Sequence, residues 1–516
     1  MKKNLVSLMT LTLLVGLVSL TSCKKENALG DGTQFRATVE DCTSQNGKTA
    51  LDGFNLNWEA GDQIAIYGTS GPGTYSATPQ TPATVAVFDN VSGSTGDGPF
   101  RAFYPTTLTT DGVNITLPNT QTYVEGSINE FPMYAESSDN QLAFKNLCGV
   151  LKLHLTKANT NISSITITAA SEINGTFSVS YNSGDPELIY SANGTTTTTL
   201  TCATAQSIAE GKDFYIYLPE GSYSGLQIEM NTDDSRYCVK TANTAINVTR
   251  SQVTFITLGS TLQFRPIGSK GGLFTINADG DQVWFSQGNL KYQASNAIWQ
   301  FADNQYDYIG SANSNISATN PGWIDLFGWG TGNNPTLHTT NYTDYTTFVD
   351  WGSNYINNGG EVLNKWRTLN SAEWEYIFNT RSNTTNFATD NARYYKTKVN
   401  DITGVILFPD GYIHPTSVPV PTAINSNGSG GGHSPYYTLA QWAEMEAAGA
   451  VFLPLAGYRI NTEVGGLSSD GGYWSSTIHE TVTYCANYVS NLSSSYIMSI
   501  NPLYWGFSVR LVRDNE

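Results

Sequence analysis

The stretch WRTLNSAEWEYIF, residues 366–378, predicts a helix in a chain whose other patterns mostly indicate short strands and turns. Asn370 stands where a helix needs its N-cap, and Glu373 follows three residues later, which is the spacing of a capping box. Leu369 and Trp374 flank this box at the spacing of a hydrophobic staple. We therefore expect a short helix that packs Trp374 into a hydrophobic core.

A second stretch, YTLAQWAEMEAAG at 437–449, repeats this design. Thr438 is the predicted N-cap, Gln441 is the N3 residue, and Gly449 is the stop signal. Trp442 is expected in the core, like the tryptophan of the first helix. Two capped helices among many short strands predict an α+β domain, in which helices pack on a sheet.

The chain from about residue 35 to 262 has a different pattern. Segments such as NLNWEAGDQIAIYG (55–68) alternate apolar and polar residues and are broken by Gly, Asn and Asp. Helical periodicity is almost absent from this region. The pattern predicts an all-β region built of antiparallel sandwiches.

This region also resembles the fimbrillin-like (type V pilin) proteins of Bacteroidetes. The resemblance is carried, in the order of that family, by motifs within 48–68, PMYA at 132–135, FKNLCGVLK at 144–152 and YIYLPEGSYSGLQIEM at 215–230. It implies two β-sandwich subdomains that divide near residue 140. The family supplies pilus subunits, pilus anchors and surface lipoproteins, and its stalk subunits exchange strands with their neighbours. Its stalk pilins mature by cleavage after an arginine, and Arg36 lies near such a place.

A boundary follows at residues 263–272, where Pro, Gly and Ser interrupt the apolar pattern and predict a linker. Ten of the eleven tryptophans lie beyond residue 280. The region 273–516 resembles the formylglycine-generating-enzyme-like branch of the C-type lectin-like fold, through residues 366–378 and the motifs GAVFLPLAGYR, GYWSST and GFSVRLVRD. This resemblance implies a closed module whose N- and C-terminal strands pair.

An oxidase-type enzyme of that branch is a disfavoured alternative. The resemblance implies an active-site pair of cysteines that hold copper, and residues 273–516 contain Cys485 alone. His154, His338, His414, His433 and His479 are far apart in the sequence, form no metal-binding motif, and are expected at the surface. The EPN and WND signatures of calcium-dependent lectins are missing. We expect no enzyme activity, no cofactor and no metal site.

The segment 478–505 is the predicted ligand-binding surface. Its composition is rich in Tyr, Ser and Asn, which binding faces use as rigid anchors and adaptable donors. It also resembles the variable segment of C-type lectin-like proteins that a retroelement diversifies. A loop without any ligand is the open alternative. The candidate ligand-binding residues are His479, Thr481, Thr483, Tyr484, Asn487, Tyr488, Ser490, Tyr496, Tyr504 and Trp505. The tyrosines, Asn487 and Trp505 are expected to be partly exposed on one face, framed by Tyr473, Trp474 and Arg510.

The N-terminus predicts export. Lys2 and Lys3 precede an apolar run that ends in LTSC, a lipobox-like motif with Cys23 as the lipid-attachment residue. An ordinary signal peptide with an incidental cysteine is the alternative. We predict a signal peptide at 1–22, a tether at 23–34, and a lipid anchor in the outer membrane, exposed at the cell surface.

The net charge and the cysteines limit the partners and the sites that we expect. A net charge of −17 and the lack of Lys/Arg clusters argue against nucleic acid. Cys148 lies in a stretch whose leucines alternate with Lys152, His154 and Thr156, and in such a half-buried strand it is expected as a small buried thiol, while a Cys202–Cys238 disulfide is an open alternative. CxxC motifs are absent from the sequence, which excludes a zinc knuckle.

Together these patterns predict an adhesin-like surface lipoprotein with a fimbrillin-like stem and a lectin-like head. The head is expected to bind a glycan or a protein on another cell, and pilins are expected partners through strand exchange. The chain enters a second domain after the stem, which favours a pilus tip subunit or a free lipoprotein over a stalk subunit. A purely structural surface lipoprotein is the third alternative.

Overall fold

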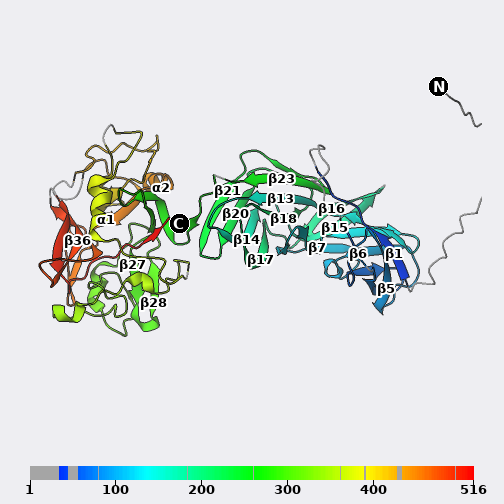
Figure 1. Cartoon of the computed structure of the whole chain (residues 1–516), viewed down its shortest axis with the longest axis horizontal. Helices are drawn as coiled ribbons and strands as arrows, with labels where there is room; N and C mark the ends of the chain where they lie inside the picture. The colour runs from blue at the N-terminus through cyan, green and yellow to red at the C-terminus, as the bar shows by residue number, and fades with distance from the viewer. Residues whose placement is uncertain are drawn as a thin grey trace, which may run out of the picture.

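The computed structural model describes residues 34–44, 56–79, 81–182, 184–259, 261–360, 362–388, 391–426, 433–493 and 496–515. The predicted signal peptide, the tether and Cys23 lie outside these residues. Figure 1 shows two bodies placed end to end, which we call the stem (34–266) and the head (269–515). Strands dominate both bodies and helices are few, and within the described ranges no helix is long and apolar enough to cross a membrane.

The first sheet forms the end of the stem that lies far from the head (Figure 1). Its strand order is β11-β1-β5-β4-β3-β6-β10-β12, and only the β1–β11 pair is parallel among the pairs described. The strands are β1 (Gln34–Thr38), β3 (Gln63–Tyr67), β4 (Pro72–Ala77), β5 (Val85–Gly93), β6 (Phe100–Tyr104), β10 (Met133–Ser137), β11 (Gln141–Ala143) and β12 (Lys145–Asn146).

The rest of the stem is a sandwich of two facing sheets with smaller sheets beside them. One layer has the order β18-β13-β23-β2 and the other has the order β24-β21-β20-β14-β17-β8-β9. The first layer consists of β2 (Thr43–Ser44), β13 (Gly149–Leu155), β18 (Lys212–Leu218) and β23 (Gln252–Leu258). The second consists of β8 (Thr120–Val124), β9 (Ser127–Ile128), β14 (Asn161–Thr168), β17 (Thr197–Ser207), β20 (Gln227–Thr232), β21 (Arg236–Thr241) and β24 (Arg265–Pro266). The smaller sheets are β7 (Asn114–Leu117), β15 (Gly175–Asn182) and β16 (Asp185–Ala192), and β19 (Gly221–Tyr223) with β22 (Ile246–Val248).

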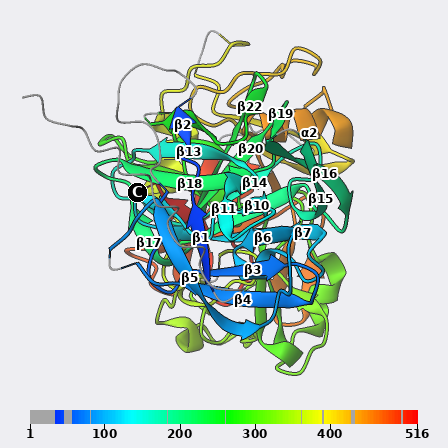
Figure 2. The same ribbon diagram turned by 90° about the vertical axis from the view of Figure 1, so that its right-hand side faces the viewer.

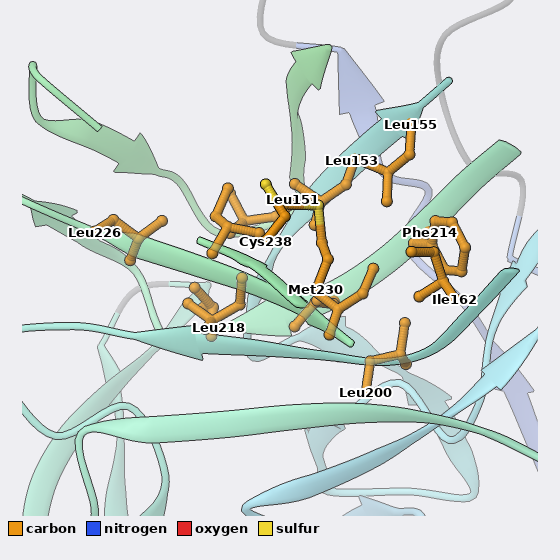
Figure 3. Packing of buried hydrophobic residues seen from close by; sticks show 14 of the residues in the cluster. Leu151, Leu153, Leu155, Ile162, Leu200, Phe214, Leu218, Leu226, Met230 and Cys238 are labelled. Atoms are coloured by element: carbon orange, nitrogen blue, oxygen red, sulfur yellow. The ribbon is translucent and has the colours of Figure 1, made fainter. Parts of the chain in front are cut away.

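The alternating residues of these strands build the sandwich core. Leu151, Leu153 and Leu155 of β13 point toward Met230 of β20 and Leu200 of β17, as Figure 3 shows, and all are almost fully buried. Burial of this apolar area is the main stabilising contribution to such a sandwich. The predicted all-β character of the stem is confirmed.

The stem does not divide near residue 140 into two separate subdomains, as the resemblance implied. Strands β7 and β8 precede residue 140 but pair with β15 and β17, which follow it. Strand β2, at Thr43–Ser44, pairs with β23 more than 200 positions later. One core cluster also combines Leu117 with Val150. The two halves of the stem therefore share strands and core.

Arg36 lies in the middle of β1 and not in an exposed loop. Phe35 and Ala37 on either side of it are fully buried, while Arg36 points outward. Strand β1 is paired along its length with β5 on one side and with β11 on the other. Cleavage after Arg36 would require these pairings to open first.

The head contains five small sheets among its described residues. They are β25 (Ser269–Thr275), β26 (Gln282–Ser286) and β38 (Val512–Asp514); β27 (Leu290–Gln293), β28 (Ile298–Phe301) and β29 (Trp323–Ile324); β30 (Tyr394–Val399), β31 (Ile402–Leu407) and β32 (Val451–Pro454); β33 (Tyr458–Ile460) and β34 (Glu463–Gly465); and β35 (Gly472–Ile478), β36 (Cys485–Ser493) and β37 (Tyr496–Pro502). Strand β26 pairs with β38, so the first and last parts of the head lie side by side, as the resemblance implied.

Both predicted helices form with their capping boxes. In α1 (Ser371–Glu375) the Glu373 amide donates to Asn370 Oδ1 at 2.9 Å, and the Asn370 amide donates to Glu373 Oε2 at 2.8 Å. The helix is short because residues 376–380 continue as a π-helical turn. In α2 (Leu439–Ala447) Thr438 and Gln441 form the second box. The tryptophans of both helices are buried, so their predicted core role is confirmed.

The segment 263–272 is not the free linker that its composition predicts. Strand β24 pairs with β21 and so forms the edge of the stem's seven-stranded sheet. Arg513 of β38 is buried and donates through Nη2 to the backbone oxygen of Asp234 at 2.6 Å, and Ser235 Oγ donates to the Gly360 oxygen at 2.7 Å. The C-terminal end of the described chain accordingly lies between the two bodies (Figure 1). Figure 2 shows the same molecule turned by 90°, so that the first sheet of the stem faces the viewer.

Candidate ligand-binding face of the head

The segment 478–505 is built mostly of strand and not of irregular loop. Strand β36 pairs with β35 on one side and with β37 on the other, so most of the segment belongs to a three-stranded antiparallel sheet. Strand β36 lies at the end of the head that is farthest from the stem (Figure 1).

The frame of the segment is held by buried hydrogen bonds. Trp474 is 1% exposed, and its Nε1 donates to the Phe327 oxygen at 2.7 Å. The Tyr473 hydroxyl donates to the Pro454 oxygen at 3.0 Å. Arg510 Nη2 donates to Gln305 Oε1 at 2.7 Å. These groups are desolvated and paired, so changing them leaves buried partners unsatisfied.

The predicted partial exposure of Tyr488 is wrong. Tyr488 is 4% exposed and its ring stacks on Phe507 with a centroid distance of 4.6 Å. The reason is strand register, because Tyr488 lies opposite Trp474 and the two side chains point to the same buried face. Ser490 is buried near it. The side chain of Tyr496 lies outside the described set.

Tyr484 is the most exposed of the predicted aromatic anchors, with 49% of its surface accessible. Its ring packs against the exposed ring of Tyr342 with a centroid distance of 5.7 Å. Tyr342 begins the 3₁₀ turn Tyr342–Tyr345, which Asn341 caps by accepting from the Thr343 amide. Sequence patterns gave no indication of Tyr342, because it lies far from 478–505 and carries no local signal of its own.

The other half-exposed rings follow along the same end of the head. The Leu503 amide donates to the Tyr484 oxygen at 3.1 Å, which holds the turn before Tyr504 and Trp505 against Tyr484. Trp505 packs on Tyr458 at a centroid distance of 4.9 Å. We call the set Tyr342, Tyr458, Tyr484, Tyr504 and Trp505 the aromatic face. Aromatic rings of this kind supply large contact area at low cost in side-chain entropy.

Polar groups border the aromatic face in the turn before β36. The Val482 amide donates to His479 Nδ1 at 3.0 Å, so the imidazole closes the turn. Thr481 and Thr483 are exposed, and their hydroxyls can donate and accept. Asn487 is half-buried, and its backbone oxygen accepts from Ser475 Oγ. The arrangement offers stacking surfaces and hydrogen bonds.

The chemistry of an oxidase is not supported by these side chains. Cys485 is 5% exposed, and burial raises the pKa of its thiol. A protonated thiol is a poor nucleophile and a poor metal ligand. His414, expected at the surface, is buried with Nε2 3.1 Å from the Val418 oxygen. Within the part of the chain that the structure describes, no three His, Cys, Asp or Glu residues are grouped to hold a metal, and the five cysteines there are free, so Cys202 and Cys238 form no disulfide.

No protein-family model and no curated protein matches this chain. Among solved structures, a "putative cell adhesion protein" from Bacteroides uniformis is similar at 18% identity, covering 45% of this chain and 96% of that one, with a TM-score of 0.28. Another protein with that description, from Bacteroides ovatus, has 11% identity, coverage of 45% and 94%, and a TM-score of 0.29. The tip fimbrial protein Mfa3 from Porphyromonas gingivalis has 10% identity, coverage of 45% and 98%, and a TM-score of 0.20. TM-scores below 0.5 carry no conclusion about the function of this chain.

Proposed function

We propose that this protein is a cell-surface adhesin-like lipoprotein whose lectin-like head binds a glycan or protein ligand through the aromatic face. The observation that carries the proposal is the contact between the exposed rings of Tyr484 and Tyr342, because Tyr484 directly precedes β36, the strand that lies at the end of the head farthest from the stem (Figure 1). The buried hydrogen bonds of Trp474 and Arg510 fix the sheet behind them. Rings held on a fixed frame lose little freedom when a ligand binds.

The side chains at this end of the head favour binding over catalysis. The exposed or half-buried groups there are phenol rings, an indole, hydroxyls, an amide, the His479 imidazole and the Glu480 carboxylate, and the cysteine among them is buried. Phenol and indole rings stack on the apolar face of a sugar and equally contact apolar side chains of a protein. We therefore retain both ligand classes and assign no cofactor.

The test is a binding screen of the full chain against a glycan array and against surface proteins of neighbouring cells. Tyr484→Ala and Tyr342→Ala should each weaken the ligand that is found by about tenfold or more, since central aromatic anchors dominate binding energy. Tyr355→Ala is the matched control, because Tyr355 is a head tyrosine that is 61% exposed and lies outside the aromatic face. Equal loss in all three variants, or the absence of any ligand, would favour a purely structural lipoprotein.

The anchor and the place in a pilus are parts of the same proposal. Lipid on Cys23 would tether the stem to the outer membrane, and Cys23→Ala should release the protein into the medium. Labelled palmitate incorporated equally by wild type and variant would contradict this. We place the protein at a pilus tip or free on the surface, since the stem's edge strand β24 is already joined to the chain of the head. Gold-labelled antibody along the length of pili, instead of at their ends, would contradict the tip position.

A further inference from the structure

The stem carries a cleft that the proposed function of the head does not use. It is a cavity of about 660 Å³ between the first sheet and the β15–β16 hairpin. Sites for small molecules usually have volumes in this range. We call it the stem cleft, and its lining residues are Tyr67, Gly68, Thr69, Pro99, Phe100, Arg101, Glu136, Ser137, Ser138 and Tyr181.

Three side chains of the stem cleft form one row across three neighbouring strands. Tyr67 of β3 lies directly opposite Arg101 of β6, and Arg101 lies directly opposite Glu136 of β10. Residues opposite each other in antiparallel strands point to the same face of a sheet, about 4.5–5.5 Å apart. An aromatic ring, a cation and an anion are therefore presented side by side.

The cation of this row is available to a ligand. Arg101 is half-buried, and no carboxylate among the described residues lies within ion-pair distance of its guanidinium. Glu136 across from it accepts a hydrogen bond from the Tyr134 hydroxyl. A guanidinium offers a fork of donors that matches a carboxylate in geometry and charge.

The aromatic walls of the stem cleft are fixed by contacts beneath them. Tyr67 packs on Phe103 at 5.8 Å, and Tyr181 packs on Tyr134 at 5.8 Å. Gly112, at a φ of +67°, lies so close to the Tyr67 ring that a Cβ there would be 2.4 Å from it. The ring is thus seated on a glycine turn that no larger residue could form.

A peptide strand is a poor fit for the stem cleft. Strands β3, β6 and β10 each have a neighbour on both sides in the first sheet. Their backbone groups are therefore already paired, and strand addition has no free edge there. A ligand must instead be recognised by side chains.

We propose that the stem cleft binds an acidic saccharide. The carboxylate of the sugar would pair with Arg101, its hydroxyls would donate to Glu136, and its apolar face would lie on the Tyr67 or Tyr181 ring. A sugar with one carboxylate and several hydroxyls suits a row that holds one cation and one anion, whereas a polyanionic peptide would be repelled by Glu136. This site is separate from the aromatic face and does not depend on it.

The experiment is calorimetric titration of the full chain with the methyl glycoside of galacturonic acid, which carries one carboxylate, and with its carboxyl-reduced, neutral counterpart. The acidic form should bind more tightly, and added salt should weaken it. Arg101→Gln should lower the affinity for the acidic form by about tenfold or more and abolish the preference between the two sugars. Tyr67→Ala should weaken both forms.

Two control variants distinguish binding in the stem cleft from binding elsewhere on the protein. Lys157→Gln removes the same charge from the stem outside the cleft, and Tyr484→Ala alters the aromatic face, so neither should change the titration. An unchanged melting temperature of Arg101→Gln would show that the stem remains folded. Equal affinity for the two sugars, no binding of either, equal loss in Lys157→Gln, or binding of an acidic peptide in place of the sugar would overturn the proposal.

Discussion

Replacing Trp366 and Trp374 by phenylalanine, one at a time, tests whether the first predicted helix is seated as described. Both indoles are buried, with exposures of 2% and 0%. They lie in different core clusters, and their indole nitrogens differ in hydrogen bonding. Trp366 Nε1 donates to the Gly359 oxygen at 2.8 Å, whereas Trp374 Nε1 has no hydrogen-bond partner among the described residues.

The two substitutions remove the same atoms, so their hydrophobic and cavity costs should be similar, about 1–2 kcal/mol each. Trp366→Phe also removes a buried hydrogen bond and leaves the Gly359 oxygen unsatisfied, which costs about 1–3 kcal/mol more. Trp374→Phe instead removes a donor that the fold already leaves unpaired. Trp374→Ala should cost roughly 3–5 kcal/mol, because Phe285 and Tyr473 pack on its ring.

The assay is thermal unfolding of the full chain followed by tryptophan emission, which reports the head because ten of the eleven tryptophans lie there. For a domain of this size each kcal/mol shifts the midpoint by about 2–4 °C. Trp366→Phe should therefore melt several degrees below Trp374→Phe. Equal midpoints, or a lower midpoint for Trp374→Phe, would refute the assignment of these indole contacts.

Two further predictions concern pH and have opposite signs. Burial raises the pKa of Glu40, but hydrogen bonds from Arg250 and from the Asn146 amide outweigh burial and lower the pKa below its ordinary value. This stabilisation is present above the unfolded pKa and is lost as pH falls through the folded pKa. Glu40→Gln should thus lower the stem's melting temperature at pH 7 and change it little near pH 3, and an equal effect at both would contradict the linkage. In the head, burial raises the pKa of the Asp325 carboxyl to about 6, although a hydrogen bond from Asn313 acts in the opposite direction. Because the folded pKa lies above the unfolded one, the head should lose stability as pH rises from about 4 through 6. Calorimetry of Asp325→Asn should show a flatter dependence over this range, and an unchanged slope would assign the effect to another group.

Local signals in the sequence were sufficient for the helices. A capping box involves residues three apart, so Asn370 with Glu373 and Thr438 with Gln441 identify themselves without knowledge of the rest of the fold. The buried thiol of Cys148 was also predicted, although it precedes β13 and is buried by packing with Val150 and Tyr217, not by the alternation of that strand.

Long-range pairing was not predictable in the same way. Nothing near Thr43 indicates that β2 joins β23, because the choice of partner depends on the packing of the whole sandwich. The exposure of single residues in the candidate face was not predictable from the sequence either. Tyr484 and Tyr488 have similar neighbours in the sequence, yet only Tyr488 lies within β36 opposite Trp474 and is buried. Tyr342 reaches Tyr484 from another part of the chain.

The joint between stem and head determines the orientation of the head relative to the stem. The chain enters the head through β24, which is paired with β21, and near its C-terminal end Arg513 returns to Asp234 at the turn where β21 begins. Two attachments to one hairpin oppose swivelling, whereas a single peptide link would act as a pivot. Neighbouring molecules anchored in the same orientation would then present their aromatic faces in the same direction. A sideways force on a bound ligand would be transmitted to the stem as torque, because the head could not rotate to relax it.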